Sequence, residues 1–143
     1  MSRPPFPENA TCAYCGVLAT DWDHVIPKSL MRDARGYNYN ARDWMVPACH
    51  DCNLTLQNFA IFSVPQRAAY LCTRIKQRFR KVLKLPAWDE DELEELGPSL
   101  RASLLRTQLE KAEVEHRLVH LAAIAIEPED YLRPRGYNPP SLL

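Results

Sequence analysis

Four of the five cysteines form two pairs with two residues between the partners: Cys12 with Cys15, and Cys49 with Cys52. Two thiolates at this spacing on a tight turn can face one metal ion, and Gly16 supplies the backbone freedom that such turns often need. Two such pairs complete a tetrahedral four-thiolate shell, which leaves no position for water or substrate. We therefore expect a structural Zn²⁺ that staples together the segments on either side of it.

Two neighbouring features bear on this metal site. His50 lies within the second pair and could compete as a ligand, although the surface of the turn is its expected place. A redox dithiol is the other use of Cys-x-x-Cys spacing, but it would need thiols that react while zinc is bound. Cys72 belongs to neither pair and falls on an apolar stripe, so we expect a buried core thiol there.

An Asp-His pair, Asp23-His24, lies between the two halves of the expected zinc site. The combined pattern reads C-x-x-C, then D-H-V-x-P-x-S, then P-A-C-x-x-C-N. This pattern resembles the HNH endonuclease family over about residues 12–60. The resemblance implies a ββα-metal fold that hydrolyses phosphodiester bonds in DNA.

The resemblance also implies roles for individual residues. His24, whose imidazole has an unperturbed pKa of about 6.5, would be the general base that activates water. Asp23 would be an oxygen ligand for a catalytic Mg²⁺ or Mn²⁺, which would offset charge on the scissile phosphate. The last motif residue of the family would fall at Asn58, whose amide oxygen would be a second ligand of that cation.

The sequence departs from the family pattern at two positions. The middle motif residue, usually an asparagine that orients the catalytic histidine, falls at Trp44, and Asn38 or Asn40 could replace it from the preceding loop. Leu56 stands where a lysine is common. Asn53 is expected to cap the turn beside the zinc. These departures leave a second interpretation open, a catalytically decayed module that binds DNA or a protein partner as an inhibitor or adaptor.

The elements that must position these residues follow from local patterns. Short β-like runs cover 23–26 and 44–48, and a helix is expected from His50 to Phe59. Ser63 and Pro65 form a typical helix start, and apolar residues recur at helical spacing from there to Leu85.

Basic residues are concentrated in the first part of the chain. Residues 1–85 contain twelve Lys/Arg and six Asp/Glu, a net of +6, and residues 86–143 the reverse, a net of −6. We expect DNA phosphates to contact a basic face of the 63–85 helix and a second wall near the loop, with weak sequence preference. The expected DNA-binding residues are Lys28, Arg32, Arg67, Arg74, Arg78 and Lys81.

The C-terminal half combines an acidic run with a long helix. Residues 89–96 hold six acids and read most simply as a solvated linker, although they could also mimic phosphate towards a protein partner. In the expected helix 99–125, an apolar stripe alternates four and three residues apart, and Glu113 and Arg117 have ion-pair spacing. The stripe, which would pack on its own domain or form a homodimer, is Leu105, Leu109, Ala112, His116, Val119 and Ala123.

These patterns predict an α+β chain with a small zinc-stapled ββα core and a C-terminal extension of two or more helices. The expected organisation is a leader at 1–11, a nuclease-like domain at 12–85, an acidic and helical extension at 86–126, and a proline-rich tail at 127–143. No apolar run resembles a secretion signal or a membrane span, so we expect a cytoplasmic protein with no membrane partner.

Overall fold

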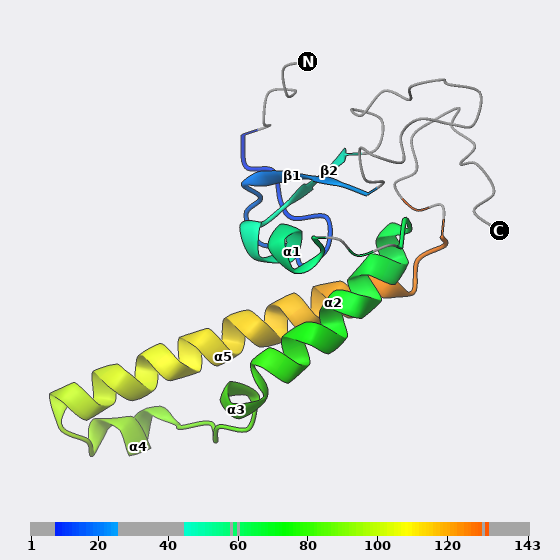
Figure 1. Cartoon of the computed structure of the whole chain (residues 1–143). Coiled ribbons are helices and arrows are strands. Elements are labelled where there is room, and N and C mark those ends of the chain that lie inside the picture. The colour runs from blue at the N-terminus through cyan, green and yellow to red at the C-terminus, as the bar shows by residue number, and fades with distance from the viewer. Residues whose placement is uncertain (1–7, 26–44, 58, 60, 130, 132–143) are drawn as a thin grey trace, which may run out of the picture.

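The computed structural model describes residues 8–25, 45–57, 59, 61–129 and 131. It confirms a small α+β chain, in which a two-stranded antiparallel sheet and a short helix stand on a pair of long helices (Figure 1). Within the described residues, no helix has both the length and the apolar character needed to cross a membrane.

The sheet is formed by β1 (Asp21–His24) and β2 (Met45–Ala48). Asp23 pairs with Val46 and His24 with Met45, so the predicted Asp-His pair lies at the end of β1. The strand begins two residues before the predicted range, and Ile26 lies outside the described residues. Ahead of it, the first cysteine turn is attached to β2 by a hydrogen bond from Ala13 N to Pro47 O, 2.8 Å.

Helix α1 (His50–Thr55) follows β2 directly and begins inside the second cysteine pair. The Cys49 sulfur accepts a hydrogen bond from the Cys52 backbone N–H, which caps the first turn of the helix. The helix is shorter than predicted, since it ends at Thr55 and not at Phe59.

Helix α2 (Val64–Arg78) starts where the sequence predicts, with the Ser63 side chain accepting from Gln66 N and a proline in the first turn. The predicted continuous helix to Leu85 is broken at Phe79, where the backbone leaves helical geometry. One further turn, α3 (Arg80–Leu83), follows this break.

The acidic run is helical and not a linker. Helix α4 (Glu90–Glu94) begins with a complete capping box between Asp89 and Glu92, which satisfies backbone donors at the start of the helix. Acids in a first turn also interact favourably with the helix dipole, which explains why so charged a segment folds. The acids of this run are exposed, and α4 lies at the far end of the long helices from the sheet (Figure 1).

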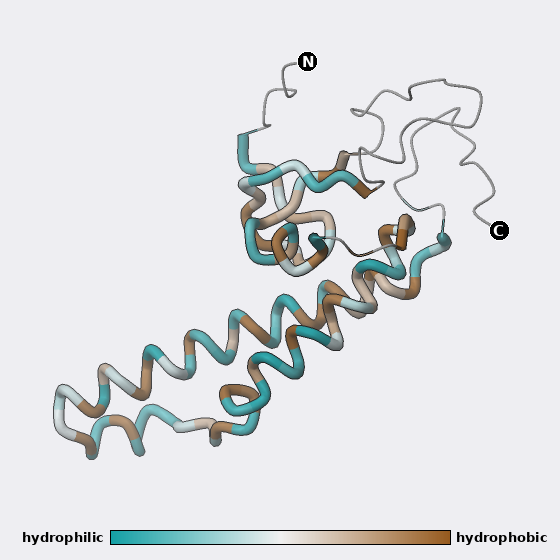
Figure 2. The backbone as a smooth tube through the Cα atoms, in the orientation of Figure 1, coloured by the Kyte–Doolittle hydropathy of each residue, from teal (hydrophilic) through white to brown (hydrophobic). Residues whose placement is uncertain are grey.

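The C-terminal part of helix α5 (Pro98–Ala125) runs antiparallel to α2, and its first part extends beyond α2 towards α4 (Figure 1). Its inward face buries Val114, Leu121 and Ile124 against a core that includes Leu71 and Ile75 of α2. Figure 2 shows how apolar residues alternate with polar ones along both helices.

The stripe that spacing singled out on α5 is not the one that packs. Leu105 is 41% exposed, Leu109 66% and Val119 71%, so packing of this stripe on the chain's own domain is wrong. Both faces of α5 carry apolar residues, and the branched side chains at 114, 121 and 124 fit the space beside α2. The Leu105–Ala123 stripe is left on the surface.

Candidate metal centre and active-site cleft

The four paired cysteines converge on one point. Their sulfur atoms all lie within 4.8 Å of one another, and all four residues are buried. In each pair the second backbone N–H points at the first sulfur: Cys15 N lies 3.5 Å from the Cys12 Sγ, and Cys52 N lies 3.4 Å from the Cys49 Sγ. This group could hold a metal ion such as zinc, as predicted, whereas His50 is outside it with its side chain 76% exposed.

Crowding of the four thiols separates their acidities. Hydrogen bonds from Cys12, Cys49 and Cys52 lower the pKa of Cys15 far below the ordinary range of a thiol. Contacts with Cys12 and Cys15 raise the pKa of Cys49 and of Cys52.

Beside this centre, a cleft of about 310 Å³ lies between β1, α1 and the start of α2. Asp23 and His24 line it from the strand, so the predicted catalytic pair does face a cavity. The other polar residues that line the cleft are His50, Asn53, Gln57 and Arg67.

Asp21 orients two of these residues from the start of β1. Its Oδ2 lies 3.0 Å from His50 Nδ1 and accepts a hydrogen bond from Asn53 Nδ2 at 3.3 Å. The hydrogen bond from His50 holds the pKa of Asp21 below its ordinary value. A carboxylate here therefore fixes an imidazole and an amide at the mouth of the cleft.

Asn53 is a cleft residue that sequence reasoning assigned only to capping. It lines the same cavity as Asp23 and His24, whereas Asn58 lies outside the described residues. The available signal was its place directly after Cys52, in the helix that begins inside the second cysteine pair. Asn53 is thus a described amide, with Gln57, that lines the cleft together with the Asp-His pair.

Asp23 is engaged differently from the prediction. Its two carboxylate oxygens accept hydrogen bonds from Arg67 Nη2 at 3.0 and 2.9 Å, and the Tyr14 hydroxyl donates to Oδ2. Asp23 is only 3% exposed, Arg67 2% and Tyr14 0%. Because a guanidinium already neutralises this carboxylate away from water, Asp23 does not fit the predicted role of Mg²⁺ ligand in this arrangement.

The same contacts correct the prediction for Arg67. Its guanidinium also donates to the Ile61 carbonyl at 2.9 Å, and the residue is only 2% exposed, so it is held in the core at the wall of the cleft and not presented on an exposed DNA-binding face. Burial lowers the pKa of Arg67, but Tyr14 and Asp23 more than offset this, so the net shift is upward. Burial, joined by repulsion from Asp23, raises the pKa of Tyr14, which keeps the phenol protonated as a donor.

The other predicted DNA contacts fall into three groups. Arg74 and Lys81 are exposed on α2 and α3. Arg78 is half-exposed, but its guanidinium donates to Asp51 Oδ1 at 2.6 Å and to Thr55 Oγ1 at 2.8 Å, so it binds α1. Lys28 and Arg32 lie outside the described residues, as do Trp44, Asn38 and Asn40.

Comparison of the chain with models of protein families, with curated proteins and with solved structures finds no match in any of the three. The case for function therefore rests on the residues and their geometry.

Proposed function

We propose that the chain is an HNH-type endonuclease that hydrolyses phosphodiester bonds in DNA with weak sequence preference. The observation that carries the proposal is the cleft in which His24 and Asp23 of β1 meet Asn53 of α1, directly beside the four-cysteine centre. A zinc ion in that centre would hold the strand and the helix in fixed relation, which hydrolysis at a defined point requires.

In this proposal His24 is the general base, and it removes a proton from the water that attacks the phosphorus atom. Asp21 fixes His50 and Asn53, which can hydrogen-bond the phosphate oxygens at the mouth of the cleft. The buried pair of Asp23 with Arg67 sets the position of β1 against α2, and so that of His24 next to it. Exposed cations farther along the helix that carries Arg67 would contact the duplex backbone.

The involvement of Mg²⁺ or Mn²⁺ remains part of the proposal. Asp23 is paired with Arg67, so a divalent cation would have to use other oxygen donors of the cleft, or Asp23 would have to exchange its partner. The contribution of the divalent cation to cleavage is measured by adding a chelator while the zinc occupancy of the four-cysteine centre is kept constant.

A plasmid cleavage assay with zinc-loaded protein tests the proposal. Nicked or linear product is expected, and His24→Ala should lower the rate by about 10²–10⁴-fold, the usual contribution of a general base. Asn53→Ala should lower it as well. Glu127→Ala provides a control, because Glu127 is exposed and lies outside both the cleft and the Leu105–Ala123 stripe. Equal cleavage by wild type and His24→Ala would reject His24 as the base.

A non-catalytic binding module is the second candidate. The observation that favours it is the burial of Asp23 in an ion pair with Arg67. In this pair a carboxylate of the motif has a structural role and not a catalytic one. Such a module would show no cleavage with Mg²⁺ or Mn²⁺, yet retain salt-dependent DNA binding that weakens on Arg74→Ala and Lys81→Ala. A protein that instead binds a basic partner through the exposed acids of α4 would show neither DNA cleavage nor DNA binding.

The exposed stripe on α5 predicts a homodimer. Heptad-like spacing of Leu105, Leu109 and Val119 matches helix pairing between two copies. Light scattering coupled to gel filtration should give about twice the chain mass, and Leu109→Glu should give a monomer because a charge would be buried in the interface. Lys84→Glu, at an exposed position directly after α3, is the control. A monomeric wild type at high concentration would contradict the prediction.

A further inference from the structure

Three helices meet at one carboxylate beside the metal centre. Asp51, in the first turn of α1, accepts from Arg78 of α2 at 2.6 Å and from Arg117 of α5 at 2.8 Å. Sequence spacing suggested that Arg117 pairs with Glu113 on its own helix, but its guanidinium turns inward to α1 instead. Asp51 lies between the two cysteines of the second pair, so this contact ties the long helices to the metal shell.

Arg117 also reaches a ligand atom itself. Its Nη2 lies 3.6 Å from the Cys52 Sγ, within range of a hydrogen bond to sulfur, and its side chain is only 11% exposed. Among the described residues its Nε is buried with no hydrogen-bond partner. Burying a guanidinium with one donor unsatisfied is costly, and a compensating negative charge nearby is what makes it stable.

Asp51 supplies one such charge, and the four-thiolate centre would supply more with zinc bound. A Zn²⁺ ion bound by four thiolates carries two excess negative charges, which must be balanced where water is excluded. N–H groups that donate to the sulfur atoms spread this charge and hold the thiolates in place. A cation from α5 next to Cys52 would therefore balance part of the negative charge that the two cysteine turns leave unbalanced.

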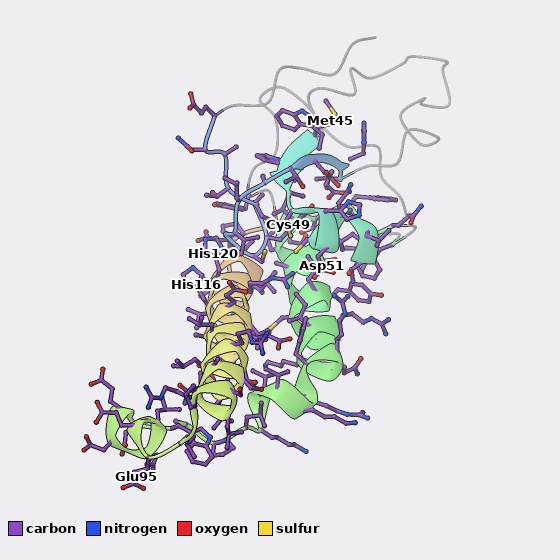
Figure 3. All side chains as sticks on the ribbon, turned by 90° about the vertical axis from the view of Figure 1, so that its left-hand side faces the viewer. Met45, Cys49, Asp51, Glu95, His116 and His120 are labelled. Carbon is purple, nitrogen blue, oxygen red and sulfur yellow. The ribbon has the colours of Figure 1, made fainter. Side chains whose placement is uncertain are left out.

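One turn farther along α5, His120 contacts the first cysteine turn. Its Nδ1 lies 3.2 Å from the Tyr14 carbonyl oxygen, and a β-carbon built on Gly16 would lie 2.5 Å from Cδ2 of its ring. Gly16 adopts a φ of 81°, so glycine serves both the turn and the close approach of the helix. Figure 3 shows His116 and His120 at the level of Cys49 and Asp51, with α5 passing beside the centre.

We propose that α5 completes the metal centre: Arg117 is an outer-shell partner of the zinc-thiolate group, so that zinc binding and docking of the C-terminal helix stabilise each other. The helix touches both cysteine turns, through His120 at the first and Arg117 at the second. Arg117 is a positioning residue, because it acts through Cys52 and Asp51 and not on a substrate. The proposal does not depend on nuclease activity.

Zinc affinity, measured by competition with a colorimetric chelator, tests the first half of the proposal. Arg117→Met keeps the length of the side chain and removes its charge, and should weaken zinc binding about 10–100-fold, as other outer-shell changes do. Arg117→Lys keeps the charge and should lose less. Arg106→Met is the matched control, since Arg106 is an exposed arginine of the same helix, and it should bind zinc as the wild type does.

Hydrogen exchange tests the second half. Adding zinc to metal-free wild type should slow amide exchange in residues 114–124, where α5 lies on the core, and saturating zinc should slow it less in Arg117→Met. Wild-type zinc affinity in Arg117→Met would overturn the proposal, as would exchange in 114–124 that ignores zinc. If Arg117→Met fails to fold, two other measurements test the proposal. They are the zinc affinity of Arg117→Lys compared with that of Arg106→Met, and the effect of zinc on amide exchange in the wild type.

Discussion

Replacing Arg67 by methionine is expected to lower the free energy of unfolding by about 3–5 kcal/mol, the usual cost of removing one partner of a buried ion pair. The variant would leave Asp23 3% exposed with no cation beside it. Arg67 also donates to the backbone carbonyls of Phe59 and Ile61, which join α1 to α2. Urea denaturation followed by circular dichroism measures the change.

Three further variants define the origin of this loss. Arg74→Met is the matched control, since Arg74 is an exposed arginine on the same helix and should change stability by less than about 0.5 kcal/mol. Tyr14→Phe removes one hydrogen bond to Asp23 and should cost about 1–3 kcal/mol, since an acceptor is left buried. Arg67→Met combined with Asp23→Leu should recover part of the stability. An Arg67→Met protein as stable as Arg74→Met would refute the assignment.

The metal centre could be predicted from the sequence because its signal is local. Cys-x-x-Cys spacing places two sulfur atoms on one turn whatever the rest of the chain does, and two such pairs leave few other uses. The start of α2 was predictable for the same reason, since Ser63 and Pro65 act within a single turn. The two strands lie at Asp21–His24 and Met45–Ala48, close to the β-like runs that the sequence predicts at 23–26 and 44–48.

The role of Arg67 could not be predicted because its partner is distant in sequence. Positions 67, 71 and 75 lie on one helical face, and Leu71 and Ile75 are fully buried, but the basic side chain of Arg67 led to its assignment to the DNA-binding face. An arginine enters a core only with a fixed counter-charge, and Asp23 lies 44 residues away on another element. A helix pattern alone cannot reveal such a pair.

The packing face of α5 was ambiguous for a different reason. The stripe through Leu105 and Leu109 and the face through Leu121 and Ile124 are both apolar, so periodicity could not choose between them. Two tertiary contacts determine which face of α5 packs inward. One is the packing against α2, and the other is the ion pair of Arg117 with Asp51. Both determinants are tertiary, so they became visible only in the folded chain.

Removing zinc is expected to abolish the fold of the cysteine-bearing unit, residues 8–57. In its described residues, 8–25 and 45–57, the regular structure is two four-residue strands and one six-residue helix, which is too little to be stable in water unaided. Structural zinc contributes about 10–16 kcal/mol in zinc-finger peptides, more than most small domains have in total stability. The α2–α5 pair should survive in part, since it packs through Leu71, Ile75 and Leu121.

Limited proteolysis and circular dichroism with and without chelator measure this loss. Cys15→Ser and Cys52→Ser should behave like the chelated protein even with zinc present, because a closed shell tolerates no missing thiolate. Cys72→Ser is the matched control, since Cys72 lies outside the cluster and should retain zinc and fold. Readdition of zinc should restore the wild type and not the two cluster variants. A protein that keeps its cysteine-bearing unit protected without metal would show that the thiols pack as ordinary core residues.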